Sequence, residues 1–217
     1  MFYSENFTPN KLRFGDVIKG YIESLPVIDK PFCNSQQKEY KYSIESSLSE
    51  FSVIMTPCCN IENKIVSLTP LCKIPKTLFR NPYFVKDFTI LNREIEPEKT
   101  LPPNNWLELN QEEKEKRLSK GLQYAFNYFF FYKEYDLLPE YDVQISGNNY
   151  KTRSYLIDFR HIYPSKCEGI TKEKIHEEIL CSKFLELDVY TRKELRDKLA
   201  NYYGRPADVD KVTISSI

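Results

Sequence analysis

Residues 50–71, "EFSVIMTPCCNIENKIVSLTPL", place two apolar runs on either side of a polar turn. The runs, residues 51–56 and 64–69, are too continuous to be half-exposed strands. They predict two strands in the core of a small barrel or curled sheet. The turn carries Cys58 and Cys59, which in a strand would point to opposite faces and suit joint ligation of one metal ion poorly. We therefore expect these two thiols to be structural.

The composition is that of a globular protein. Of the 217 residues, 41% are hydrophobic and 14% are aromatic, which a disordered chain would not show. The 31 basic residues equal the 31 acidic residues, so no net field attracts nucleic acid. Six cysteines without paired C-x2-C spacing predict no metal site, and no motif predicts a cofactor. Without a long apolar stretch or a signal-peptide pattern, we expect a cytoplasmic protein that does not enter a membrane.

The segments around the two core strands are less regular. Residues 14–28 alternate partly between apolar and polar positions and predict a strand, in which Gly15 and Gly20 allow a bulge or a close backbone approach. Residues 29–41 are polar and predict a loop. Several prolines punctuate residues 75–103 and predict irregular chain over the surface.

A helix is predicted from Asn110, its cap, to about Tyr135, because acidic residues crowd the first turn. Its aromatic residues form an unusually wide apolar stripe. One interpretation is a core helix, and the other is a surface that binds a partner or a second subunit. The partner-binding residues in the second interpretation are Phe126, Phe129, Phe130 and Tyr132.

The C-terminal half contains a predicted hairpin and two predicted helices. The hairpin spans residues 141–163 and turns at residues 147–149, which tolerate positive φ. The helices span residues 171–184 and 191–203. Thr191 and Glu194 have capping-box spacing in the second helix, and Gly204 stands where that helix should end.

These elements together predict one α+β domain. Residues 1–105 form a small β-barrel portion with an irregular segment. Residues 106–217 supply a helix, a hairpin and C-terminal helices.

The best catalytic constellation is "IDFRHIY", residues 157–163. Strand alternation puts Asp158 and Arg160 on one face and His161 on the other. Arg160 is suited to bind phosphate and His161 to act as a general acid or base. The alternative is an exposed Asp158–Arg160 pair beside a packed histidine. Elsewhere "TRKELRDK", residues 191–198, is most simply a solvated helix face. The residues that could stack on bases are Tyr202, Tyr203 and Arg205.

The N-terminal third resembles the MazF/PemK family of toxin barrels, which have an SH3-like fold. The resemblance lies in three segments of residues 12–74, namely "FGDVIKGYI", "FSVIMTP" and "KIVSLTPL". The family cuts single-stranded RNA without metal, with an arginine before the first apolar strand and a threonine after the next. Glu50 holds the arginine position, and a carboxylate there would repel the scissile phosphate. The threonine position falls on Thr69 or Cys72.

Two functions follow from this resemblance. The first is a non-catalytic regulator in a prokaryotic toxin–antitoxin or antiviral defence (CRISPR-type) system, which holds a protein from the same operon such as a transcription factor or an effector. The second is a metal-independent endoribonuclease in which Arg160, His161 or Arg13 contacts the phosphate near Thr69, with RNA as the ligand. A purely structural subunit of a larger complex is a third hypothesis.

Overall fold

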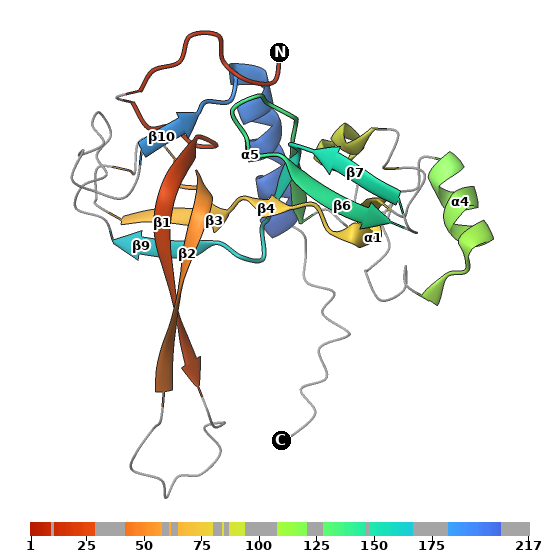
Figure 1. Cartoon of the computed structure of the whole chain (residues 1–217), viewed down its shortest axis with the longest axis horizontal. Coiled ribbons are helices and arrows are strands. Elements are labelled where there is room, and N and C mark those ends of the chain that lie inside the picture. The colour runs from red at the N-terminus through yellow and green to blue at the C-terminus, as the bar shows by residue number, and fades with distance from the viewer. Residues whose placement is uncertain are drawn as a thin grey trace, which may run out of the picture.

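The computed structural model shows a mixed α+β chain of antiparallel sheets and helices (Figure 1). It describes residues 1–9, 11–28, 42–57, 61, 65–79, 84, 87–93, 108–120, 128–145, 148–166 and 182–204. The loop expected at 29–41 and the Cys58–Cys59 pair lie outside these residues. Among the described residues, no helix has the length and apolarity needed to cross a membrane.

The largest sheet is built mainly from the N-terminal strands, in the order β10-β1-β2-β3-β9. Its strands are β1 (Val17–Ile28), β2 (Tyr42–Ile54), β3 (Ile65–Pro70), β9 (Tyr163–Lys166) and β10 (Ser182–Leu185). The strands predicted at 14–28, 51–56 and 64–69 are confirmed. Over the described residues the outer strands β10 and β9 do not pair with each other, so the sheet as described is open and no closed barrel is present.

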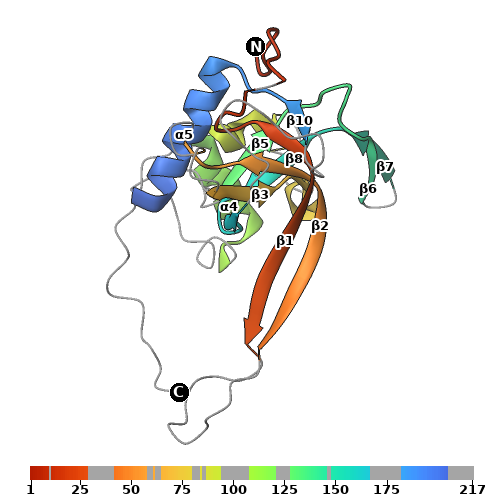
Figure 2. The same cartoon turned by 90° about the vertical axis from the view of Figure 1, so that its left-hand side faces the viewer.

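Both faces of this sheet are buried at its base, which explains the continuous apolar runs. Phe51 and Val53 belong to the main hydrophobic core. Ile54 lies in a second cluster on the other face, formed by Leu12, Ile18, Ile54, Ile61, Val66 and Leu68. Beyond this base β1 and β2 continue as a two-stranded ribbon that stands clear of the body (Figures 1 and 2). We call residues 21–28 and 42–49 the arm.

Two smaller sheets complete the β-structure. The first has the order β4-β8-β5, with β4 (Cys72–Lys73), β8 (Tyr155–Asp158) and β5 (Phe129–Tyr132). The second is the hairpin of β6 (Tyr141–Ile145) and β7 (Asn148–Thr152), which confirms a hairpin here. The second predicted strand is shorter than expected, because the chain breaks after Thr152 and turns again at residues 159–160.

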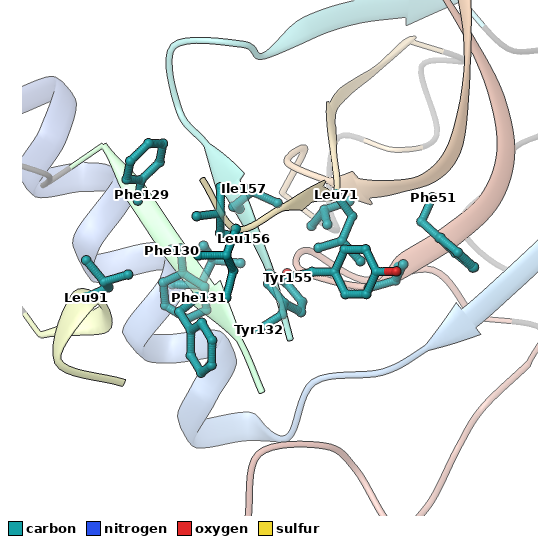
Figure 3. Close-up of a cluster of buried hydrophobic side chains, with 14 of the residues drawn as sticks. Phe51, Leu71, Leu91, Phe129, Phe130, Phe131, Tyr132, Tyr155, Leu156 and Ile157 are labelled. Carbon is teal, nitrogen blue, oxygen red and sulfur yellow. The ribbon is translucent and has the colours of Figure 1, made fainter. Parts of the chain in front are cut away.

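The aromatic stretch at residues 129–132 is a strand and not the end of a helix, so that part of the helix prediction is wrong. The helix α4 (Gln111–Ser119) is much shorter than predicted, and β5 pairs with β8. Aromatic residues fit a pleated surface well, and a short apolar run does not by itself separate helix from strand. Phe129, Phe130 and Tyr132 are 7%, 0% and 0% exposed and pack in the core (Figure 3). No partner surface is formed by these three, and Phe126 lies outside the described residues.

The remaining helices are α1 (Lys76–Phe79), the 3-10 helix η2 (Phe88–Asn92) and α5 (Val189–Gly204). Asn110 caps α4 as predicted, since its Oδ1 accepts from the Glu113 amide at 2.9 Å. In α5 the predicted cap is wrong: Asp188 Oδ1 accepts from the amides of Tyr190 and Thr191 at 2.6 and 3.1 Å. Of the helix predicted at 171–184, residues 182–184 lie in β10, and the rest is outside the described residues.

Candidate protein-binding groove

Thr69, Arg160 and His161 are brought together around Asp158, the last residue of β8. Thr69 lies in β3 and its hydroxyl donates to the Asp158 carbonyl oxygen at 3.3 Å. Arg160 Nε donates to both oxygens of the Asp158 carboxylate, at 2.9 and 3.1 Å, and its Nη2 donates to Oδ2 at 2.6 Å. His161 Nδ1 lies 3.6 Å from Asp158 Oδ2. These three residues are the catalytic candidates from the sequence. Arg160 and His161 lie at the carboxylate of Asp158, and Thr69 bonds its backbone carbonyl.

The contacts of this group are those of a structural ion pair. The Arg160 guanidinium lies 3.9 Å from the centre of the Tyr128 ring, and its hydrogen bond with Asp158 raises the pKa of Arg160. Asp158 thereby neutralises the positive charge of Arg160, which would otherwise attract a phosphate. Thr69 is fully buried, so its hydroxyl faces protein and not solvent. A substrate phosphate would have to compete with Asp158 for the Nε and Nη2 donors of Arg160.

The other residues considered for phosphate chemistry lie elsewhere. Arg13 forms an ion pair with Glu186. Glu50 is exposed at the base of the arm. Burial, with a smaller contribution from the charge of Glu50, raises the pKa of Tyr155. Cys72, the other residue at the threonine position, lies half-buried in β4.

A buried cluster of charges fixes α5 against the N-terminal strand. The Lys183 ammonium is fully buried and donates to Asp16 Oδ2 at 2.8 Å and to Glu186 Oε2 at 2.6 Å. Arg192 lies in the first turn of α5. Its Nη2 is 3.7 Å from Asp16 Oδ1 and 3.6 Å from Glu186 Oε1. At Gly15 the backbone has φ +85°, and a Cβ there would lie 2.8 Å from Leu187 Cδ1. This close approach and the ion cluster set the position of the helix.

The same cluster predicts a pH optimum of stability. Burial, the largest cause, raises the pKa of Asp16 from its ordinary 3.8 to about 6. The contribution of Asp16 to the free energy of unfolding is fully present below pH 3.8 and is lost as the pH rises through 6. For Glu186, hydrogen bonds from Lys183 and Thr8 outweigh burial and lower the pKa to about 2, so its contribution is present above pH 4.5 and is lost as the pH falls toward 2.

We therefore expect the free energy of unfolding to rise by about 1–2 kcal/mol from about pH 7 to about pH 4.5, and to fall as the pH drops further below about 4. Urea unfolding across this range measures the change. Asp16→Asn keeps the side-chain shape and should remove the rise while it leaves the fall in acid. A stability that decreases steadily from neutral pH would contradict the assignment to Asp16.

A mainly apolar groove with a volume of about 660 Å³ runs along α5. Buried Phe14 and Met55 contribute to its lining from the N-terminal half of the chain. Several large apolar side chains of α5 are exposed beside it, with Val189 at 68%, Tyr190 at 76% and Tyr203 at 63%. The full lining is Phe14, Met55, Pro57, Val189, Tyr190, Arg192, Lys193, Arg196, Leu199, Ala200 and Tyr203.

Among the described residues, the charged side chains that line the groove are all basic: Arg192, Lys193 and Arg196. The side chains of Lys193 and Arg196 are 67% and 64% exposed, and both contact Asp197, which is not part of the described lining. Arg192 is directed to the buried cluster and donates to the Leu187 carbonyl oxygen at 2.8 Å. The groove thus combines an apolar floor with a cationic rim, which suits an amphipathic segment carrying acidic residues.

Sequence reasoning missed this groove because its lining comes from distant parts of the chain. The segment at 191–198 was interpreted as a solvated face, yet Leu195 is fully buried and Lys198 is 3% exposed. The missed signal is the set of apolar residues at both ends of α5, where a fully solvated helix needs none.

Comparison with known proteins identifies no relative of this chain. Neither protein-family models nor curated protein sequences nor solved structures give a match to the chain.

Proposed function

We propose that this chain is a non-catalytic protein-binding module whose groove along α5 holds an acidic, amphipathic segment of a partner. The observation that carries the proposal is the groove itself, with apolar residues exposed along α5 and with basic side chains as the charged part of its described lining. Monomeric proteins seldom leave such a face uncovered. The aromatic residues first expected to bind the partner are core residues, so the binding surface moves from β5 to α5.

The resemblance to the MazF/PemK family supplies the biological setting of the proposal. In that setting the N-terminal strands correspond to strands of an SH3-like barrel, here arranged as an open sheet over the described residues, and the catalytic arginine has been lost. The chain then acts as a regulator in a prokaryotic toxin–antitoxin or antiviral defence (CRISPR-type) system, with a transcription factor or effector of the same operon as its partner. The antiparallel neighbours β1, β2 and β3 support this arrangement, and the exposed carboxylate of Glu50 supports the loss of ribonuclease activity.

A labelled peptide tests the groove. The probe is an amphipathic helix of about 16 residues built from leucine and glutamate, which matches the roughly 24 Å length of α5. We expect it to bind, and we expect the double variant Lys193→Glu/Arg196→Glu to bind it at least about tenfold more weakly, because each lost contact is worth about 1 kcal/mol or more. Fluorescence anisotropy measures both affinities.

The matched control is Lys116→Glu/Lys120→Glu, which changes the net charge equally on exposed positions in and beside α4. It should bind the peptide like the wild type. A lysine-and-leucine peptide that binds as tightly as the glutamate peptide would contradict the charge argument. Cleavage of single-stranded RNA in EDTA, lost in Arg160→Ala, would overturn the module in favour of the ribonuclease.

A further inference from the structure

A second cavity lies between the first turns of α5 and the 3-10 helix η2, which contact each other. Its volume of about 660 Å³ falls in the range of small-molecule sites. Charged and polar side chains make up most of its described lining, in contrast to the apolar groove. Tyr190 and Lys193 line both hollows, so the two are neighbours on α5. A polar cavity of this size suits a small charged ligand.

Asn92 fixes one wall of this cavity. Its buried side-chain amide donates to the Phe131 carbonyl oxygen at 2.9 Å and accepts from the Phe131 amide at 2.6 Å. Because this pairing occupies both ends of the side chain, Asn92 holds η2 against β5 and is not itself a ligand-binding group. The next residue, Arg93, and the residue after β5, Lys133, consequently line the same cavity.

Arg93 and Lys133 are the cations of this wall. Both are exposed, and neither forms an ion pair with another residue in the described part of the chain. Lys133 also lies over the Phe2 ring, with its Nζ 5.8 Å from the ring centre. Hydrogen bonds from Thr89 lower the pKa of Asp87, and the charges of both cations add to that shift. Arg93 and Lys133 therefore lie near the same carboxylate, which is not in the described lining of the cavity. Two neighbouring cations of this kind suit an anionic ligand.

The wall formed by α5 has a different character. Lys193 and Asp197 form an ion pair with each other, so their charges largely cancel. Glu194 forms no ion pair with any residue that the structure describes, so its carboxylate is available as a hydrogen-bond acceptor. Tyr190 is 76% exposed, so much of its ring is open to contact. This wall thus provides an acceptor and an aromatic surface beside the two cations.

We propose that this cavity binds a nucleoside phosphate. Arg93 and Lys133 bind the phosphate oxygens, because a guanidinium and an ammonium both form charge-assisted hydrogen bonds with phosphate. Glu194 accepts hydrogen bonds from the ribose hydroxyls. The base stacks on the ring of Tyr190, since every base has a π-face. A free phosphate would use only the cations, and an uncharged nucleoside would leave them without an anion.

This site does not depend on the groove being a protein-binding site. The phosphate-binding residues, Arg93 and Lys133, are not part of the described lining of the groove. Tyr190 and Lys193 are shared, so a nucleotide in the cavity lies beside the rim on which the groove binds its partner. The two sites can therefore be tested one at a time.

Isothermal titration calorimetry with ADP tests the proposal. EDTA is present, so that the protein and not a metal ion holds the phosphates. We expect ADP to bind, and we expect adenosine and inorganic pyrophosphate each to bind at least about tenfold more weakly, because each lacks half of the contacts. Adenosine that binds as tightly as ADP would contradict the role of the cations. Pyrophosphate that binds as tightly as ADP would show a simple anion site and overturn the nucleotide.

Two variants test the assigned residues. Arg93→Ala/Lys133→Ala should weaken ADP binding by at least about tenfold, because both charge-assisted contacts to phosphate are lost. Lys116→Ala/Lys120→Ala removes the same charge from exposed positions in and beside α4 and should bind ADP like the wild type. Glu194→Gln should weaken the binding of ADP and should not weaken the binding of pyrophosphate, which has no ribose. Unchanged ADP affinity in Arg93→Ala/Lys133→Ala would overturn the site.

The leucine–glutamate peptide separates this site from the groove. Circular dichroism verifies the fold of Arg93→Ala/Lys133→Ala, which should bind the peptide like the wild type, because neither residue lines the groove. Loss of both ligands in this folded variant would contradict a separate nucleotide site. A wild type that binds ADP and no peptide would overturn the groove alone, and one that binds the peptide and no ADP would overturn the nucleotide site alone.

Discussion

Phe130→Ala is expected to lower the free energy of unfolding by about 3–5 kcal/mol, because it removes a fully buried ring from the centre of β5. Phe130 pairs with Ile157 of β8, and its ring lies 5.8 Å from the ring of Tyr132 in an edge-to-face arrangement. The surrounding strands hold the space open, so the cavity term adds to the lost burial. Urea unfolding monitored by circular dichroism measures the change.

The control is Tyr150→Ala in β7. It removes another aromatic side chain, but Tyr150 is 47% exposed. This substitution should change the free energy of unfolding by no more than about 1 kcal/mol. The comparison also separates the two sequence interpretations of the aromatic stretch. If Phe130 lay on a partner-binding helix, its replacement would cost little stability and would weaken an interaction instead. A change in unfolding free energy as small as that of Tyr150→Ala would contradict the core position.

Local sequence patterns predicted the elements whose signals are local. The strands around residues 51–69, the cap at Asn110 and the helix that ends at Gly204 each depend on residues near one another in the chain. The aromatic stretch failed because a helical stripe and a doubly buried strand both present apolar residues without interruption. Pairing with β8, about 26 residues later, decided between them, and no local pattern records that pairing.

The site shows the same division between local and distant signals. The ion pair of Asp158 and Arg160 was expected from strand alternation, and it exists, although a turn after β8 and not a continued strand brings the two together. The groove joins Phe14 and Met55 to α5, nearly the length of the chain away. The apolar residues at both ends of α5 are a local signal, but the sequence does not show that Phe14 and Met55 lie beside them.

Those buried charges lead to the other large effect: Lys183→Met should lower the free energy of unfolding by about 3–5 kcal/mol. The substitution keeps an apolar stem of similar length but removes the ammonium that Asp16, Glu186 and the Lys11 carbonyl share, at 2.8, 2.6 and 2.7 Å. Two buried carboxylates then lose the cation placed between them. Lys193→Met is the matched control, because Lys193 pairs with Asp197 on the surface and such pairs contribute about 0–1 kcal/mol.

A second substitution identifies the cause of the loss. Adding Asp16→Asn to Lys183→Met removes one of the two carboxylates that have lost the lysine, so the double variant should be more stable than the sum of the two single changes predicts, by about 1–3 kcal/mol. Simple loss of packing at Lys183 would instead give additive effects. Because the cluster holds α5 in place, Lys183→Met should also weaken peptide binding in the groove, although Lys183 does not line it. A variant that unfolds as readily as predicted yet keeps full peptide affinity would show that the groove does not depend on these charges.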